Sequence, residues 1–260
     1  MTRLHSGAVA TIPSRPAGRL AGRRAVITGA ARGIGAEIAA SFRREGAELA
    51  LIDIEVERLA VTCEAVDGRP YGVDLADIDA TRDVMGRAIT DLGGIDILVN
   101  NAGVLKMAPL LEIDPADWDS TFAVNVRAML LTIQAAATTM IANKRGAIIN
   151  MASMGGKLGA PNQAHYAASK AAVISLTQVA AKELGQYGIT VNCICPGYVL
   201  TEMGAATRTD EMVREWSSKS PLGRLAEPSD VANMAVFLAS DEASYCTGQA
   251  MNVTGGMVMH

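Results

Sequence analysis

The architecture of this chain follows from the stretch Ala25-Val26-Ile27-Thr28-Gly29-Ala30-Ala31-Arg32-Gly33-Ile34-Gly35, in which a short apolar run leads into a glycine-rich turn. The turn has the spacing G-x-x-x-G-x-G, and the pattern after it is helical. Glycines allow a tight turn and let the backbone approach a pyrophosphate, which the unpaired N–H groups of a helix start can hold. A plain strand-to-helix turn has a similar composition, so the rest of the chain must decide between the two interpretations.

Six further β-rich runs follow, and each is separated from the next by a segment long enough for a helix. The predicted strands cover residues 25–28, 48–53, 70–73, 95–100, 146–151, 189–195 and 249–253. Such alternation predicts right-handed crossovers and a mostly parallel sheet with helices on both faces. The runs 50–52 and 97–99 are continuously apolar, as is typical of strands buried on both sides. The fold class is therefore α/β, with a doubly wound sheet of seven mostly parallel strands.

Length and composition fit one domain. The chain has 260 residues, half of them hydrophobic, and no linker-like stretch divides residues 21–260. Residues 1–20 stand outside this domain and are predicted to form a flexible basic tail, because Pro13 and Pro16 interrupt any amphipathic targeting helix. The net charge of −4 argues against a nucleic-acid partner. No run approaches eighteen uninterrupted apolar residues, so no membrane span is expected.

The four cysteines, Cys63, Cys193, Cys195 and Cys246, are too few and too scattered for a disulfide framework. A reducing, cytoplasmic location fits this usage. Cys193 and Cys195 alternate along a predicted strand, so they share one face of it. No histidine cluster accompanies them, and we interpret them as small core residues and expect no metal site.

Polar residues at the ends of successive predicted strands suggest a nucleotide site. Asp53 ends the second strand at about the distance where an acidic residue meets an adenosine ribose, and a carboxylate there repels a 2′-phosphate. This favours NAD over NADP. Arg32 would bind a phosphate instead, but a neighbouring carboxylate would partly neutralise it. A capping role for Asp53 at the segment starting at Glu55 is the alternative.

Two further segments stand at the same predicted edge of the sheet. Asp74 and Leu75 follow the third strand, where they would meet the adenine; Asp74 would equally serve as the N-cap of a helix beginning near Asp77. Asn101, Ala102 and Gly103 follow the fourth strand, where amides can order the nucleotide-side loops or simply form a turn.

The segment Tyr166-Ala167-Ala168-Ser169-Lys170 combines a phenol with an amine, and Ser153 stands thirteen residues before Tyr166. The apolar pattern over 164–184 predicts a helix, on which Tyr166 and Lys170 project from one face. A tyrosine pKa is about 10, and a nearby positive charge lowers it. Reaching about 7 takes roughly 4 kcal/mol, more than one exposed charge supplies, so we expect a second cation nearby, such as an oxidised nicotinamide ring. Taken alone, the five-residue pattern favours an ordinary exposed helix pair, and the rest of the chain decides against that interpretation.

Together, the segments 28–35, 100–103 and 166–170, with Ser153 and Pro196-Gly197, resemble the short-chain dehydrogenase/reductase family from about residue 20 to the end. This resemblance implies a Rossmann-type fold, a nicotinamide cofactor, a homotetramer and a catalytic tetrad that matches Asn125, Ser153, Tyr166 and Lys170. Asn125 lies in a predicted helix over 115–143, and the resemblance suggests that it holds a water in a proton relay to Lys170.

The chemistry expected of these residues is hydride transfer at a secondary carbinol carbon. Tyr166 would exchange the hydroxyl proton, Lys170 would lower the tyrosine pKa and hold ribose hydroxyls, and Ser153 would stabilise charge on the substrate oxygen. The resemblance also places the turn after the sixth strand beside the nicotinamide. The expected cofactor contacts are Gly29, Arg32, Gly33, Ile34, Gly35, Asp53, Asp74, Leu75, Asn101, Ala102, Gly103, Tyr166, Lys170, Pro196, Gly197, Val199 and Thr201.

The substrate is expected to contact Ser153, Met154, Gln163, Tyr166 and Tyr198, with Leu105, Gly155, Asn162 and Met203 as further lining residues. A flap over about 197–220 would close over the site. A surface helix with Trp216 as an ordinary aromatic anchor is the alternative, and the two are compatible. The chain resembles NAD-dependent sorbitol and gluconate 5-dehydrogenases, which implies a polyol, sugar or small diol substrate. Two alternatives are a 3-oxoacyl carrier-protein reductase, a class that generally prefers NADPH, and a nucleotide-sensing protein without catalysis.

The carboxyl-terminal end departs from the family pattern, because Thr254 stands where an aspartate is frequent before Gly255 and Gly256. The apolar tail 257–259 would be unusual in water, so we expect it to pack against another subunit. The alanine-rich faces of helices 115–143 and 164–187 are expected at a symmetric interface.

Overall fold

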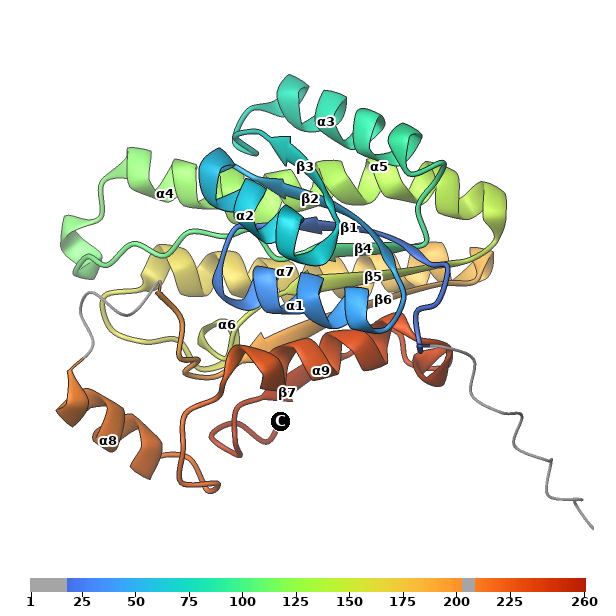
Figure 1. The fold of residues 1–260 in the computed structure, drawn as a ribbon. Coiled ribbons are helices and arrows are strands. Elements are labelled where there is room, and N and C mark those ends of the chain that lie inside the picture. The colour runs from blue at the N-terminus through green and yellow to red at the C-terminus, as the bar shows by residue number, and fades with distance from the viewer. Residues whose placement is uncertain (1–17, 203–208) are drawn as a thin grey trace, which may run out of the picture.

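The computed structural model describes residues 18–202 and 209–260 and forms one seven-stranded sheet (Figure 1). All neighbouring strands run parallel, in the order β3-β2-β1-β4-β5-β6-β7. Most of the predicted basic tail and the lining residue Met203 lie outside the described residues. The strands are β1 Arg24–Thr28, β2 Glu48–Asp53, β3 Arg69–Gly72, β4 Ile97–Asn100, β5 Gly146–Met151, β6 Ile189–Pro196 and β7 Ala250–Val253. The predicted fold class is confirmed, and each strand boundary lies within two residues of its predicted position.

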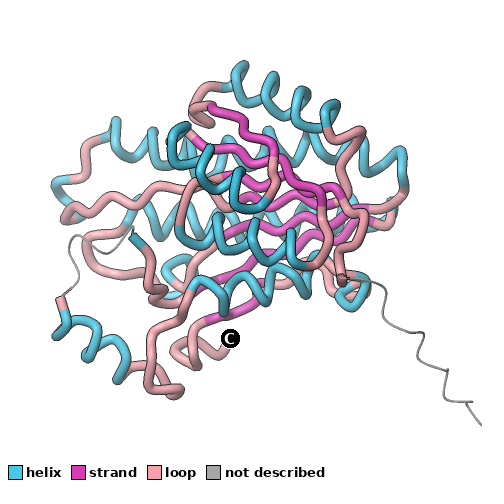
Figure 2. Tube along the Cα trace, viewed as in Figure 1, coloured by secondary structure: helices cyan, strands magenta, loops and turns pink. Residues whose placement is uncertain are grey.

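Helices cover both faces of the sheet, as Figures 1 and 2 show. One core cluster joins the sheet to α1, α2 and α9, and a second joins it to α3, α5 and α7. Neighbouring residues in a strand face opposite clusters: Ile27 belongs to the first and Val26 to the second. The helices are α1 Gly33–Arg44, α2 Val56–Val66, α3 Ile78–Asp91, α4 Pro115–Phe122, α5 Ala128–Asn143, α6 Gly155–Leu158, α7 Ala164–Leu184, α8 Asp210–Ser218 and α9 Pro228–Ala239.

The strand order reverses at β1, which lies between β2 and β4. The crossover from β1 leads through α1 to β2 on one side, and the chain later returns to place β4 on the other. In open α/β sheets ligands bind at such a switch point, outside the carboxyl ends of the strands. The glycine turn after β1, Asp53 after β2 and Asn101 after β4 therefore meet at one edge.

The helix expected over 115–143 is interrupted. A π-helical turn, Ala123–Arg127, separates α4 from α5 and contains the buried Asn125. Such turns inside helices are frequent at functional sites, because they re-aim a side chain without ending the helix. The stretch Pro115–Asn143 is long and apolar enough to cross a membrane. This is a weak indication, because half of its most apolar 18-residue segment is buried inside the domain.

A chain of buried polar side chains crosses the second face of the sheet from α5 to α7. Thr132 Oγ1 donates to Asn100 Oδ1 at 2.6 Å, and Asn100 Nδ2 donates to Asn150 Oδ1 at 3.0 Å. Asn150 Nδ2 then donates to Thr177 Oγ1 at 2.9 Å. All four side chains are at most 2 % exposed. Each of these buried polar groups has a hydrogen-bond partner, so they do not destabilise the core. The hydrogen-bonded network fixes α7 against β4 and β5.

Candidate active site

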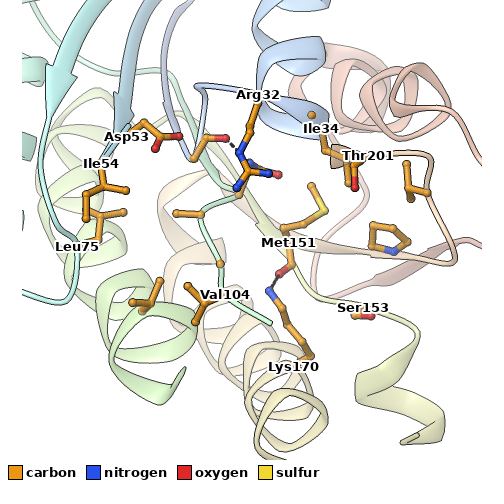
Figure 3. Close-up of a pocket in the computed structure, with 18 of the residues that line it drawn as sticks. Arg32, Ile34, Asp53, Ile54, Leu75, Val104, Met151, Ser153, Lys170 and Thr201 are labelled. Carbon is orange, nitrogen blue, oxygen red and sulfur yellow. Dashed lines mark hydrogen bonds between the residues drawn. The ribbon is translucent and has the colours of Figure 1, made fainter. Parts of the chain in front are cut away.

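A cavity of about 370 Å³ lies at the carboxyl edge of the sheet, where the strand order reverses (Figure 3). Most of the predicted cofactor residues line it, together with Ser153. The lining is Gly29, Arg32, Gly33, Ile34, Asp53, Ile54, Glu55, Val73, Asp74, Leu75, Asn101, Ala102, Gly103, Val104, Val124, Met151, Ala152, Ser153, Tyr166, Lys170, Pro196, Gly197, Val199 and Thr201.

The glycine turn shapes the middle of this pocket. Gly29 has φ +66°, and a Cβ there would lie 2.7 Å from Ala102 Cα. Gly33 also has positive φ, at the first residue of α1, and Arg32 before it makes no capping hydrogen bond through its side chain. The N–H groups that open α1 therefore remain available for an anion.

Gly35 has a packing role in the glycine turn. It is buried and absent from the pocket lining, and a Cβ on it would overlap the carbonyl oxygen of Gly29. Gly35 thus lets the first turn of α1 pack against the glycine turn, and its contact with a cofactor stays a prediction. Asn101 fixes the same turn, because its Nδ2 donates to Thr28 O at 3.2 Å and to Gly29 O at 2.8 Å.

Asp53 lies at one end of the pocket and holds two backbone segments. Its Oδ2 accepts from Ala31 N at 2.9 Å and its Oδ1 from Glu55 N at 3.0 Å. The capping alternative is wrong in detail, because the N-cap of α2 is Glu55 and Asp53 accepts from the N–H of Glu55 in the turn before the helix. The carboxylate beside Arg32 is, however, that of Glu55, since Arg32 Nε donates to Glu55 Oε1 at 2.8 Å. Figure 3 shows Arg32 reaching over the end of the pocket that holds Asp53.

Asp74 and Leu75 reach the pocket as predicted, after β3. The capping alternative for Asp74 is wrong in detail. The N-cap of α3 is Asp77, whose side chain accepts from Ala80 N, whereas Asp74 Oδ1 accepts from Ala76 N at 2.9 Å within the preceding turn. Leu75 is buried, so it presents a small apolar surface at this end of the pocket.

Ser153 and Tyr166 meet at the opposite end of the pocket. Ser153 follows β5, and Tyr166 lies in the first turn of α7, whose bounds match the predicted 164–184. Gly155 borders both side chains, because a Cβ there would lie 3.4 Å from Ser153 Oγ and 3.6 Å from Tyr166 Cε1. Gly155 N donates to Ser153 Oγ at 3.0 Å, which orients the hydroxyl.

The lowered tyrosine pKa expected from Lys170 is not found. Burial raises the pKa of Tyr166, and a hydrogen bond with Ser153 opposes this only in part. The physical reason is the position of the amine. Lys170 Nζ lies 5.6 Å from the centroid of the Tyr166 ring and donates to Met151 O at 2.8 Å. The described protein alone therefore holds Tyr166 as a neutral phenol at pH 7.

Lys170 is itself a weakened cation. It is 3 % exposed, and burial lowers the pKa of its amine to about 8. A Cβ on Gly103 would lie 3.3 Å from Lys170 Nζ and 3.2 Å from Asn125 Oδ1, so this glycine leaves room for both groups. Asn125 Oδ1 accepts from Val104 N at 2.8 Å.

Asn125 thus lies behind the pocket lining, next to the lysine, and does not face the cavity directly. Its amide has further partners that the sequence did not indicate. Asn125 Nδ2 donates to Val104 O at 3.0 Å and to Ser169 Oγ at 3.0 Å, and Ser169 Oγ donates to Tyr166 O at 2.7 Å. Ser169 therefore ties the π-helical turn to the helix that carries the tyrosine. Its place three residues after Tyr166 is the sequence signal that would have found it.

The turn after β6 closes the pocket as expected. Pro196, Gly197, Val199 and Thr201 line it, and Thr201 packs opposite Gly33, where a Cβ would lie 3.6 Å from Thr201 Cβ. The turn is held from behind, since Leu200 N donates to Ala226 O at 2.9 Å.

Three predicted substrate residues do not line the pocket. Tyr198 stacks on Trp216, with ring centroids 4.3 Å apart and planes within 5°. It lines a second cavity of about 730 Å³ between α9 and the carboxyl-terminal segment. Trp216 lies on α8, within the range of the predicted flap, part of which is outside the described residues. The flap stays a prediction. Met154 and Gln163 are half-buried beside the pocket, at the starts of α6 and α7.

The carboxyl-terminal segment packs partly on its own chain. Val258 is 4 % exposed, and its N–H donates to Thr254 Oγ1 at 3.3 Å. Thr254 closes this turn by accepting from Val258, and Met259 is left 81 % exposed.

Cys193 and Cys195 are fully buried in one core cluster, as predicted. Within residues 18–202 and 209–260, no group of three or more His, Cys, Asp or Glu side chains is placed to hold a metal.

Sequence reasoning missed several lining residues, namely Ile54, Glu55, Val73, Val104, Val124, Met151 and Ala152. Most of these stand at or just beyond a strand end, so a complete list of the residues at the carboxyl ends of β2 to β5 would have included them. Val124 is the exception, because it reaches the pocket from the π-helical turn.

The pocket fits an extended dinucleotide. One end carries a carboxylate suited to ribose hydroxyls, the middle has the open N–H groups of α1, and the far end has a phenol, an amine and a hydroxyl. At Gly29 and Gly103 the space that a side chain would fill is taken by backbone or by polar groups of the site. The order of these groups along the pocket therefore matches the ribose, pyrophosphate and nicotinamide parts of a nicotinamide dinucleotide.

Comparisons with known proteins agree with this geometry. A family model described as enoyl-(acyl carrier protein) reductase matches residues 29–258. The 3-oxoacyl-(acyl-carrier-protein) reductase of Thermotoga maritima is 39 % identical over 247 residues, which cover 93 % of this chain and 100 % of that protein. A hydroxy(phenyl)methylsuccinyl-CoA dehydrogenase subunit of Thauera aromatica is 38 % identical over 90 % of this chain and 96 % of its own.

A solved structure shows the same fold. A protein of Agrobacterium tumefaciens assigned as a gluconate dehydrogenase superposes with a TM-score of 0.88 and 31 % identity, covering 92 % of this chain and 98 % of its own. The fold is thus shared over nearly the whole length of both chains. The chain belongs to the short-chain dehydrogenase/reductase family of oxidoreductases, which use nicotinamide cofactors.

Proposed function

We propose that this protein transfers a hydride between NAD(H) and a secondary alcohol or ketone. The observation that carries the proposal is the convergence of Ser153, Tyr166 and Lys170 at one end of a pocket whose other end holds Asp53. When bound, the nicotinamide ring supplies or accepts the hydride. The residues of this chain bind and orient the reactants and move the proton.

Tyr166 is the proposed proton carrier. Its hydroxyl gives a proton to the substrate oxygen in reduction, and its phenolate takes that proton in oxidation. Ser153 donates a hydrogen bond to the same oxygen and stabilises the negative charge that develops on it. Gly155 N, which donates to Ser153 Oγ, holds the hydroxyl in this orientation.

Lys170 and Asn125 are the proposed supports of this chemistry. Lys170 places its amine beside the Tyr166 ring and beneath Gly103, where it would hold ribose hydroxyls. Asn125 fixes the loop at Val104 and, through Ser169, the first turn of α7. We propose that it also keeps a water within reach of Lys170, as the proton relay requires.

The preference for NAD is supported by charge at the adenosine end. Asp53 and Glu55 both line the pocket there, and Arg32 is paired with Glu55. A 2′-phosphate would be placed next to two carboxylates, whereas ribose hydroxyls would find acceptors.

The substrate proposed first is a polyol, sugar or sugar acid. Its support is the resemblance to sugar-alcohol and sugar-acid dehydrogenases, together with the name of the Agrobacterium structure, a "putative gluconate dehydrogenase". The second candidate is a 3-oxoacyl thioester, because curated relatives are named as reductases of that substrate class. Exposed apolar side chains of the loop beside the pocket, Met107, Leu110 and Leu111, would suit an acyl chain.

Reduced-cofactor formation distinguishes these candidates. The purified protein is assayed with NAD and NADP in parallel, against hexitols, pentitols, sugar acids, vicinal diols and simple secondary alcohols. Turnover with NAD and one polyol class supports the proposal. Activity confined to NADPH-dependent reduction of a ketoacyl thioester would leave the catalytic residues in place and refute both the cofactor and the first substrate.

We further propose a cytoplasmic homotetramer that binds neither nucleic acid nor membrane. Its support is the family resemblance, the net charge of −4 and the exposed apolar residues Leu130 on α5 and Val179 on α7. A nucleotide sensor without catalysis is disfavoured by the intact Ser153, Tyr166 and Lys170. Sedimentation at micromolar concentration tests the assembly.

A further inference from the structure

The two arginines near the adenosine end of the pocket share one carboxylate. Arg32 Nε donates to Glu55 Oε1 at 2.8 Å, and Arg58 Nε lies 3.3 Å from Glu55 Oε2. Arg58 also reaches Glu202, with Nη1 2.9 Å from Oε2. Arg32 and Glu55 line the pocket, whereas Arg58 and Glu202 lie outside its lining.

A phosphate on the adenosine 2′-oxygen would need a cation at this end. Among the described lining residues the cations are Arg32 and Lys170, and Lys170 belongs to the opposite end, bonded to Met151 O. A guanidinium binds phosphate through charge-assisted hydrogen bonds, so an unpaired Arg32 would be suited to the task. In this structure its Nε is already committed to Glu55.

Glu55 is held as an ion by the same contacts. The hydrogen bond from Arg32 is the main cause that keeps the pKa of the Glu55 carboxyl below its usual range, and charge from Arg32 and Arg58 adds to it. Around this end four carboxylates stand against the guanidinium groups of Arg32 and Arg58, namely Asp53, Glu55, Asp74 and Glu202. The local net charge is therefore −2, which repels a phosphate.

We propose that Glu55 is a specificity-determining residue that acts with Asp53 to exclude a 2′-phosphate. It does so by occupying Arg32, the cation that such a phosphate would need, and by adding a second negative charge to the pocket wall. This inference rests on the proposed function, in which NAD is the cofactor. The position of Asp53 alone would suggest that this residue discriminates between NAD and NADP. The inference assigns a part of that discrimination to Glu55.

The contribution of Glu55 can be separated from that of Asp53. Asp53 accepts from two backbone N–H groups, one of them in the glycine turn, so its replacement disturbs the turn as well as the charge. The Glu55 side chain makes no capping hydrogen bond at α2, and its ion-pair partners are the two arginine side chains. Glu55→Gln therefore removes the charge and leaves the backbone contacts in place.

The test measures binding of two fragments by calorimetry at constant ionic strength: adenosine 5′-monophosphate and adenosine 2′,5′-bisphosphate. In Glu55→Gln the bisphosphate should bind about tenfold more tightly or better, while the monophosphate should change by less than about threefold. Glu202→Gln is the matched control, because it alters the net charge equally but leaves Arg32 paired with Glu55. In this control, the ratio of the dissociation constant of the monophosphate to that of the bisphosphate should equal the wild-type ratio.

A second variant tests the route of the effect. If Arg32 provides the new contact, adding Arg32→Gln to Glu55→Gln should return the ratio to the wild-type value. An unchanged ratio in Glu55→Gln, or an equal shift in Glu202→Gln, would overturn the inference while leaving the proposed function intact. Preference of the wild type for the bisphosphate would overturn the NAD assignment and this inference together.

Discussion

Replacing Lys170 by methionine should remove a pH dependence that this buried amine gives to the stability of the protein. The amine is 3 % exposed, and burial lowers its pKa from 10.5 to about 8. In the unfolded chain it returns to about 10.5. One pKa unit corresponds to about 1.4 kcal/mol, so the folded state bears a cost of about 3 kcal/mol when the amine is protonated.

The sign follows from proton binding. Below pH 8 the amine is protonated in both states, and the full cost opposes folding. Between pH 8 and 10.5 the folded protein loses its proton first, so the unfolded state binds more protons and the free energy of unfolding rises with pH. From pH 7 to 10 this rise amounts to about 2.5 kcal/mol.

Equilibrium urea unfolding of the cofactor-free protein at pH 7, 8, 9 and 10, at equal protein concentration, measures this effect. The free energy of unfolding of the wild type minus that of Lys170→Met should increase by about 2.5 kcal/mol over this range. Loss of the hydrogen bond to Met151 O shifts the variant by a nearly constant amount. Lys182→Met, at an exposed site on the same helix, is the control and should run parallel to the wild type. Parallel curves for Lys170→Met, within about 0.5 kcal/mol, would refute the reasoning.

Three further outcomes are expected. Tyr166→Phe should lower kcat by at least about a thousandfold and leave the Kd for NAD within about threefold, as measured by fluorescence titration; surviving turnover would show that another group carries the proton. Asn150→Ala should lower the free energy of unfolding by about 3 kcal/mol in urea, because two buried partners lose their hydrogen bonds; a loss below about 1 kcal/mol would mean that the network contributes little. Gly35→Ala should weaken NAD binding by at least about tenfold, since its Cβ displaces the glycine turn, whereas Gly86→Ala, where a Cβ meets no atom within 4 Å, should bind normally. Calorimetric titration of both variants decides the last point.

The sheet and its edge could be predicted because each strand is marked by its own residues. Continuous apolar runs such as 50–52 indicate strands buried on both faces, and glycines or polar residues follow them. Parallel strands bring their carboxyl ends to one edge, so Asp53, Asn101 and Ser153 had to lie along that edge. The positions of these residues in the pocket therefore needed no information beyond strand order.

The π-helical turn and the aromatic stack could not be predicted in the same way. Residues 115–143 have a composition suited to one helix, and the shift in hydrogen-bond register at Asn125 depends on contacts with Val104 and Ser169 from other segments. Tyr198 has the residue type of a substrate contact, yet its ring packs on Trp216. Both outcomes depend on partners far away in the chain, which local patterns do not record.

The raised pKa of Tyr166 could not be predicted from the sequence either. The spacing shows that Lys170 is near Tyr166, but it does not show which group the lysine amine contacts. Lys170 directs its amine to Met151 O, and burial raises the pKa of the phenol while lowering that of the amine. Each shift favours the neutral form of its group, so the described protein alone favours a phenol over the ion pair that proton abstraction needs. The charge that activates Tyr166 must therefore enter with the ligands of the pocket. In the proposed mechanism the phenolate would then form in the assembled complex, where a substrate alcohol is present to give it a proton.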